Sequence, residues 1–171
     1  KTRKKFDGEK AAQEYLRKKH LGYFELQYLY MRSFYPSIKT TSRQQEALDY
    51  YMNQSGVYWN EFNLYGKAQS ALFNFRSENK TIAKNIIKSL KENSITSDQL
   101  GMYWKANKPG YYFHQSPIET QSLLIEAFSE IENKIETIDN LKVWLLKNKQ
   151  TNRWKTTKAT TEAVYALMLN G

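Results

Sequence analysis

The chain has 171 residues, which is enough for one domain with a sizeable core and too few for two large domains. It is 40% apolar and 15% aromatic, a composition that excludes a disordered chain. Cysteine is absent, which excludes disulfides, thiolate metal sites and a cysteine nucleophile. No apolar run approaches the roughly 18 residues of a membrane span, and the net charge of +9 makes nucleic acid a partner to consider.

The first third of the chain predicts helices. Apolar residues recur at helical spacing over 11–16 and 21–34, which predicts a first helical hairpin. Ser42, with Gln45 three residues later, predicts a capping box at the start of the next helix, and Gly56 is expected to end that helix.

The middle of the chain continues this pattern. Asn60 is expected to cap a helix that reaches Phe75, and 82–90 predicts an amphipathic helix with lysines on its outer face. A long loop, 93–115, follows it. No segment alternates as a strand would, so the sequence predicts an all-α fold.

The last part of the chain holds the clearest helix start. In 116–119 serine is a good N-cap, proline suits the first helical position, and glutamate at the third can bond back to the cap. A final pair of helices is predicted over 135–148 and 156–169.

Three tryptophans indicate a repeat. Trp59, Trp104 and Trp154 stand 45 and 50 residues apart, and each precedes a helix of small residues and leucines. In each predicted pair the first helix is striped with Lys and Glu and should lie outside, and the second should lie inside. Stacked hairpins of this kind form an open solenoid or a closed ring, and periodicity alone does not choose between them.

An aromatic cluster is the candidate ligand or partner surface. It consists of Tyr103, Trp104, Tyr111, Tyr112, Phe113 and His114. These rings could stack on a sugar or a peptide, or they could plug the ends of two helices without any ligand. We predict no catalytic, cofactor-binding or metal-binding residue.

Other candidate groups have ordinary explanations. Glu119, Glu126 and Glu130 share one side of a helix, and we expect them to be solvated rather than catalytic. His20 and His114 lack metal-ligand spacing with any carboxylate. The basic clusters lie at predicted helix ends without a nucleic-acid motif, so nucleic acid is not expected as a partner.

Three segments carry a family resemblance: 118–128, the helix WLLKNKQ at 144–150, and the stretch from Trp154 through TTKAT to 167. Together they resemble the helical thioester-domain region of the alpha-2-macroglobulin family, most of all its large bacterial members. The resemblance is strongest over 115–171. It implies an α/α toroid, partial or complete, built of antiparallel helical hairpins.

The family's reactive thioester joins a cysteine and a glutamine, and this chain has no cysteine to form one. A histidine that tunes the thioester in some members has no such role here, and His114 is expected to be a polar loop residue beside Ser116. The basic start, 1–5, lacks a signal peptide's apolar stretch. We therefore expect 1–171 to be a single helical domain and an internal piece of a larger protein.

The resemblance implies a function for that larger protein. It would be a bacterial, broad-spectrum endopeptidase inhibitor that traps proteases in the cell envelope or periplasm, with any membrane anchor elsewhere in the parent. The domain itself would not be an enzyme and would need no cofactor. Its partners would be proteases, through the parent, and neighbouring β-sandwich domains of the same chain.

Two alternatives stay open because the α/α toroid also hosts enzymes. A polysaccharide-processing enzyme requires a groove lined by the aromatics near Trp104 and two carboxylates within about 10 Å of each other. That alternative fails if Glu119 and its neighbours point outward. A helical-repeat protein-binding module requires an open superhelix with a concave face.

Overall fold

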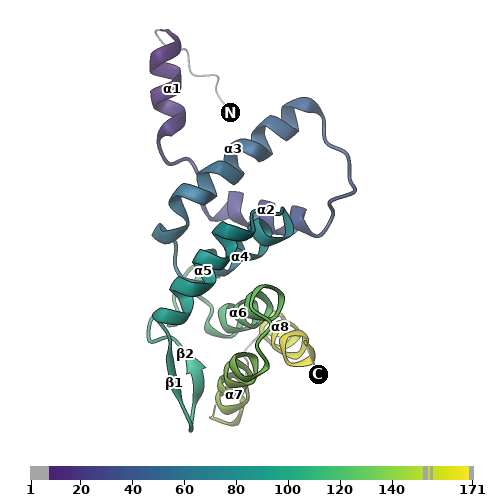
Figure 1. Cartoon of the computed structure of the whole chain (residues 1–171). Coiled ribbons are helices and arrows are strands. Elements are labelled where there is room, and N and C mark those ends of the chain that lie inside the picture. The colour runs from purple at the N-terminus through teal and green to yellow at the C-terminus, as the bar shows by residue number, and fades with distance from the viewer. Residues whose placement is uncertain (1–7, 152–153, 155, 170–171) are drawn as a thin grey trace.

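The computed structural model describes residues 8–151, 154 and 156–169 (Figure 1). The described residues form eight α-helices, two 3-10 turns and one two-stranded sheet, which confirms the predicted all-α class. The helices are α1 (Glu9–Arg17), α2 (Tyr23–Ser33), α3 (Ser42–Tyr58), α4 (Leu64–Arg76), α5 (Lys80–Glu92), α6 (Pro117–Ile131), α7 (Ile135–Thr151) and α8 (Thr157–Met168). The other elements are η1 (Trp59–Glu61), β1 (Ile95–Ser97), β2 (Gly101–Tyr103) and η2 (Phe113–Gln115).

Four helices lie side by side in the order α2, α4, α6 and α8, and two others cover them (Figure 1). Helix α5 packs on α4 and α7 packs on α6. Most residues of α4 and α6 are buried, whereas α5 buries only its stripe of Ala83, Ile86, Ile87 and Leu90. The small side chains of α4 and α6 let neighbouring helices approach from several sides, as the sequence predicted for the inner helices.

The core has two parts. The larger cluster joins α4 to α8 around Leu72, Leu124 and Phe128, which are fully buried. A smaller cluster, centred on Leu26 and Phe73, lies beneath α2 and α3.

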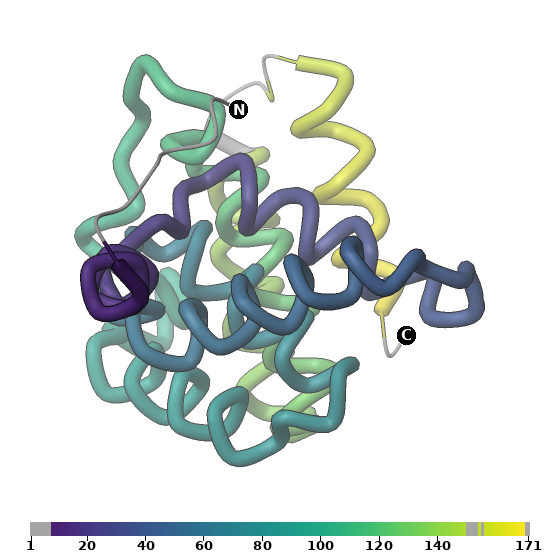
Figure 2. Tube along the Cα trace, turned by 90° about the horizontal axis from the view of Figure 1, so that it is seen from above, coloured from purple at the N-terminus to yellow at the C-terminus, as the bar shows by residue number. Residues whose placement is uncertain are grey.

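Helix α1 projects from the rest of the molecule, and Figure 2 shows it end-on at the edge of the trace. Side chains of α3 bond its last turn: the Tyr50 hydroxyl donates to the Leu16 carbonyl at 2.9 Å, and the Tyr58 hydroxyl to the Arg17 carbonyl at 2.8 Å. Helix α1 does not pack along α2, so the predicted first hairpin is wrong.

Two helix starts differ from the prediction. Helix α3 is capped by Thr41, which forms a capping box with Gln44 one residue ahead of the predicted pair, because Thr and Ser are nearly equivalent caps. Gly56 lies inside α3 and does not end it. Helix α6 begins at Pro117 as predicted, although the Ser116 side chain makes no capping hydrogen bond.

Asn63, and not the predicted Asn60, caps α4. Its side-chain oxygen accepts from the Gly66 amide at 3.1 Å, and its side-chain nitrogen donates to the His114 carbonyl at 2.7 Å. Asn60 lies in η1, the turn that separates α3 from α4. Asn63 therefore ties the start of α4 to the loop before α6.

We expect Asn63→Ala to lower the free energy of unfolding by about 1–2 kcal/mol, because it removes a helix cap and a second hydrogen bond. Thermal and urea unfolding followed by circular dichroism measure this change. The matched control is Asn60→Ala, an exposed position where the change should stay within about 0.5 kcal/mol. Equal effects at the two positions would contradict the assignment of the cap.

A short hairpin corrects the expectation that no strand would form. Strands β1 and β2 pair antiparallel, with Ile95 opposite Tyr103, and β2 packs against α7. Gly101 has a φ of +70°, and a Cβ atom there would stand 2.1 Å from the Asn140 carbonyl oxygen. Only glycine allows this backbone conformation and this close approach to α7.

Candidate functional site

The structure divides the predicted aromatic cluster into a buried part and an exposed part. Trp104 is only 3% exposed, and its indole nitrogen donates to the Leu90 carbonyl at 2.8 Å. Its ring lies 6.3 Å from that of Phe128. Tyr103 is half-buried on β2. Trp104 is thus a core residue.

His114 and Phe113 form a plug over the N-terminal ends of α2 and α4. The His114 ring stacks on Tyr23 with centroids 3.5 Å apart, and its Nδ1 lies 3.1 Å from the Asn63 amide nitrogen. The Phe113 ring meets that of Tyr65 edge-on at 6.1 Å. Burial lowers the pKa of His114. This half of the cluster therefore covers the ends of two helices, the second of the two arrangements that the sequence left open.

The other half of the cluster faces solvent and continues onto α2. Tyr111 is 94% exposed, Tyr112 is also exposed, and the ring of Phe113 lies 6.1 Å from that of Phe24, which is 80% exposed. Tyr28 follows Phe24 by one helical turn and is exposed too. We call Phe24, Tyr28, Tyr111, Tyr112 and the exposed edge of Phe113 the aromatic surface.

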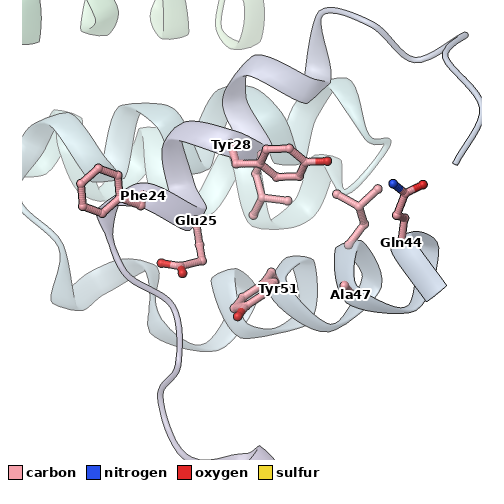
Figure 3. Close-up of a pocket in the computed structure, with 8 residues that line it drawn as sticks. Phe24, Glu25, Tyr28, Gln44, Ala47 and Tyr51 are labelled. Atoms are coloured by element: carbon pink, nitrogen blue, oxygen red, sulfur yellow. The ribbon is translucent and has the colours of Figure 1, made fainter. Parts of the chain in front are cut away.

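An apolar groove of about 270 Å³ adjoins the aromatic surface between α2 and α3. Figure 3 shows Phe24, Glu25 and Tyr28 on one wall and Gln44, Ala47 and Tyr51 on the other. The sequence carried a signal for this groove, because Phe24 and Tyr28 recur at helical spacing. That spacing predicts an apolar face without saying what covers it.

A second, polar cavity of about 150 Å³ lies among α2, α4, α6 and α8. Its lining residues are Gln27, Tyr30, Tyr65, Ser122, Leu123, Glu126, Lys158, Glu162 and Tyr165. We call it the polar cavity. The expectation of solvated carboxylates on α6 is wrong for two of the three, since Glu126 is 4% exposed and Glu119 is 7% exposed. The packing of α4 and α8 against α6 buries them.

Arg76 bonds Glu126, one of the carboxylates that line the polar cavity. Its guanidinium donates to Glu126 at 2.5 Å and, through Nε, to Glu130 at 3.0 Å. The Tyr30 hydroxyl donates to the same Glu126 carboxylate at 2.9 Å. Burial raises the pKa of Glu126, against the opposing effect of these hydrogen bonds. Burial also raises the pKa of Tyr30, which stays a neutral donor.

Glu162 also lines the polar cavity, and its ion-pair partner is Lys158. Lys158, one turn earlier on α8, places its ammonium 3.4 Å from the Glu162 carboxylate. Burial raises the pKa of Glu162, Lys158 lowers it, and the charges of Glu119 and Glu126 raise it further. Glu119 itself has no hydrogen-bond or ion-pair partner among the residues that the structure describes.

Carboxylates from α6 and α8 and tyrosines from α2, α4 and α8 meet in this cavity. It is smaller than the roughly 300 Å³ at which typical ligand pockets begin. Within the described residues, no group of three or more His, Asp or Glu side chains is placed to hold a metal ion.

Comparison with protein-family models, with curated proteins and with solved structures gives no match for the chain. In the part of the chain that the structure describes, no helix is long and apolar enough to cross a membrane.

We expect Glu162→Gln to raise the melting temperature at pH 7. The folded state binds the Glu162 proton more tightly than the unfolded chain does, because the pKa is raised from its ordinary value of 4.5. The stability that this group contributes is full below that value and is lost as the pH rises through the folded pKa. The gain from Glu162→Gln should therefore grow from about pH 4.5 to pH 7.

Differential scanning calorimetry across that pH range measures the gain. Glu136→Gln, an exposed carboxylate on α7, is the matched control and should leave the pH dependence unchanged. A gain from Glu162→Gln that does not vary with pH would contradict a raised pKa.

Proposed function

We propose that the chain is a non-catalytic helical domain of a bacterial alpha-2-macroglobulin-like protein, a broad-spectrum endopeptidase inhibitor that traps proteases in the cell envelope or periplasm. The resemblance of 118–128, 144–150 and 154–167 supports the family. The row of α2, α4, α6 and α8, covered by α5 and α7, is compatible with part of an α/α toroid.

The aromatic surface is the observation that carries the proposed role of this domain. Soluble domains rarely expose a contiguous apolar patch of this kind unless another surface covers it. Phe24 and Tyr111 are largely exposed, and the ring of Tyr112 lies beside that of Tyr111. In the proposed parent protein, neighbouring β-sandwich domains cover this surface, and the contact transmits the conformational change that encloses a protease.

The test uses the full-length protein with Phe24→Ser and Tyr112→Ser combined. Protease treated with the unaltered protein should lose activity on a protein substrate and keep activity on a small peptide, because a trapped protease remains accessible to small molecules. The variant should protect the protein substrate less. Val57→Ser, an exposed apolar position on α3 outside the aromatic surface, is the matched control.

Failure of the unaltered protein to protect the protein substrate would overturn the proposed function. Full trapping by the Phe24 and Tyr112 variant would overturn the role of the aromatic surface alone. A covalent adduct with the protease that methylamine pretreatment prevents would show that the parent carries a thioester outside this cysteine-free chain.

A second candidate, a polysaccharide-processing enzyme, is favoured by one observation: Glu126 and Glu162 line the same cavity. Against it, the cavity is too small for a sugar chain, and Trp104 does not line it. Release of reducing sugar from polysaccharides, abolished by Glu162→Gln, would replace the proposed function with this one.

A further inference from the structure

We propose that a basic groove beside the starts of α4 and α6 binds an acidic peptide segment of a partner protein, whose carboxylates pair with lysines of the groove. The groove consists of two adjoining hollows of about 440 Å³ and about 190 Å³. The two hollows share three lining residues, Asn63, Leu64 and Ala106. We call the two together the lysine groove. The inference does not depend on the proposed function, because no residue of the aromatic surface lines this groove.

The charged side chains of the lysine groove carry one sign. Lys67 and Lys105 line the larger hollow, and Lys108 lines the smaller one. Among the residues that the structure describes, no Asp or Glu lines either hollow. The apolar groove between α2 and α3 and the polar cavity, by contrast, each include at least one carboxylate. The lysine groove therefore complements a negatively charged partner.

The lysines of the groove have no carboxylate of their own. In the described part of the chain, none of the three forms an ion pair. A lysine close by behaves differently: the Lys19 ammonium lies 4.4 Å from the ring centroid of Phe62, which lines the larger hollow, and it is bound to Glu61 at 2.9 Å. Carboxylates from a partner can thus pair with the groove lysines without displacing an internal ion pair.

The backbone adds to this positive charge. Leu64, the first residue of α4, lines both hollows, and Thr120, near the start of α6, lines the smaller one. The N-terminal end of a helix carries a partial positive charge. The starts of α4 and α6 therefore reinforce the attraction that the three lysines exert on an anion.

The wall of the larger hollow favours a peptide over a phosphate backbone. Its apolar lining residues are Phe62, Leu64, Ile95 and Trp104. An apolar side chain between acidic residues can bury itself against this wall, whereas a phosphate backbone offers no such group. Among the described residues no arginine lines the groove, although arginine is the side chain that binds phosphate with two parallel hydrogen bonds. An acidic segment with apolar residues between its carboxylates fits both features.

The test measures binding of a fluorescein-labelled peptide, Glu-Glu-Leu-Phe-Glu-Glu, to the full-length protein by fluorescence anisotropy at low salt. The peptide should bind saturably, and added salt should weaken it. A peptide with glutamine in place of every glutamate should bind at least about ten-fold more weakly, because it lacks the charge. A peptide with serine in place of leucine and phenylalanine should also bind about ten-fold more weakly, because it leaves the apolar wall uncovered.

Two triple variants test whether the groove is the site. Lys67→Gln, Lys105→Gln and Lys108→Gln combined should weaken binding of the acidic peptide by about ten-fold. The matched control combines three substitutions at exposed positions of α5, Lys80→Gln, Lys84→Gln and Lys88→Gln. It changes the net charge equally and should weaken binding by less than about two-fold.

Three results would overturn the proposal. The first is the absence of saturable binding by the acidic peptide. The second is an equal loss in the two triple variants with unchanged circular dichroism, since the attraction would then come from net charge alone. The third is tighter binding of a labelled oligothymidylate than of the acidic peptide, lost in the groove variant, which would assign the groove to nucleic acid.

Discussion

Replacing Arg76 with methionine is expected to lower the free energy of unfolding by about 3–5 kcal/mol, because Glu126 would keep its charge in a buried place without a cation. The Arg76 side chain is 14% exposed and that of Glu126 is 5% exposed, so solvent screens their ion pair little. The guanidinium also lies 4.2 Å from the Phe34 ring centroid, a contact that methionine only partly replaces. Urea unfolding followed by circular dichroism measures the loss.

Two further variants test the cause of this loss. Lys88→Met removes an exposed ion pair to Glu92 and should change stability by less than about 0.5 kcal/mol. Adding Glu126→Gln to Arg76→Met should recover part of the loss, because the neutral amide is cheaper to bury than the unpaired carboxylate. A loss below about 1 kcal/mol for Arg76→Met alone would show that water reaches the network.

Trp104→Ala should lower the free energy of unfolding by about 3–5 kcal/mol, as expected for a large aromatic side chain removed from a packed core. Trp104 packs near Phe128 and bonds the Leu90 carbonyl at the end of α5. Trp104→Phe should lose less, since the ring remains and only the hydrogen bond and part of the volume go. Thermal unfolding measures both variants.

The matched control for Trp104 is Tyr111→Ala. Both residues belong to the cluster that the sequence marked as a candidate surface, yet Tyr111 is solvent-exposed and should contribute within about 0.5 kcal/mol. A large loss at Tyr111 and a small one at Trp104 would reverse their assignment to surface and core.

Local patterns made much of the fold predictable. The apolar stripe that includes Ile86 and Leu90 predicted α5, and the residues around Pro117 predicted the start of α6. Both signals are local, because helical period and helix-start chemistry depend on neighbouring residues alone. The hairpin of β1 and β2 escaped prediction because strands of three residues are too short to show a period. Gly101 was the available signal for it.

The candidate sites were harder to predict, because they depend on contacts between distant segments. An aromatic residue such as Trp104 is compatible with either core or surface until its neighbours are known. Glu119 and Glu126 were expected to be solvated because carboxylates on helices usually are. Their burial arises where α4 and α8 pack on α6, and nothing in the sequence around the carboxylates encodes that packing.

The polar cavity has a consequence for the order of folding. The Tyr30 hydroxyl reaches Glu126 across 96 residues of chain, and α8 supplies the opposite wall. Contacts that close so long a loop cost chain entropy, so we expect them to form late. Helices α4 and α5, like α6 and α7, are neighbours in sequence and can pair early. We therefore expect the cavity to close late in folding, and changes at Tyr30 to speed unfolding more than they slow folding.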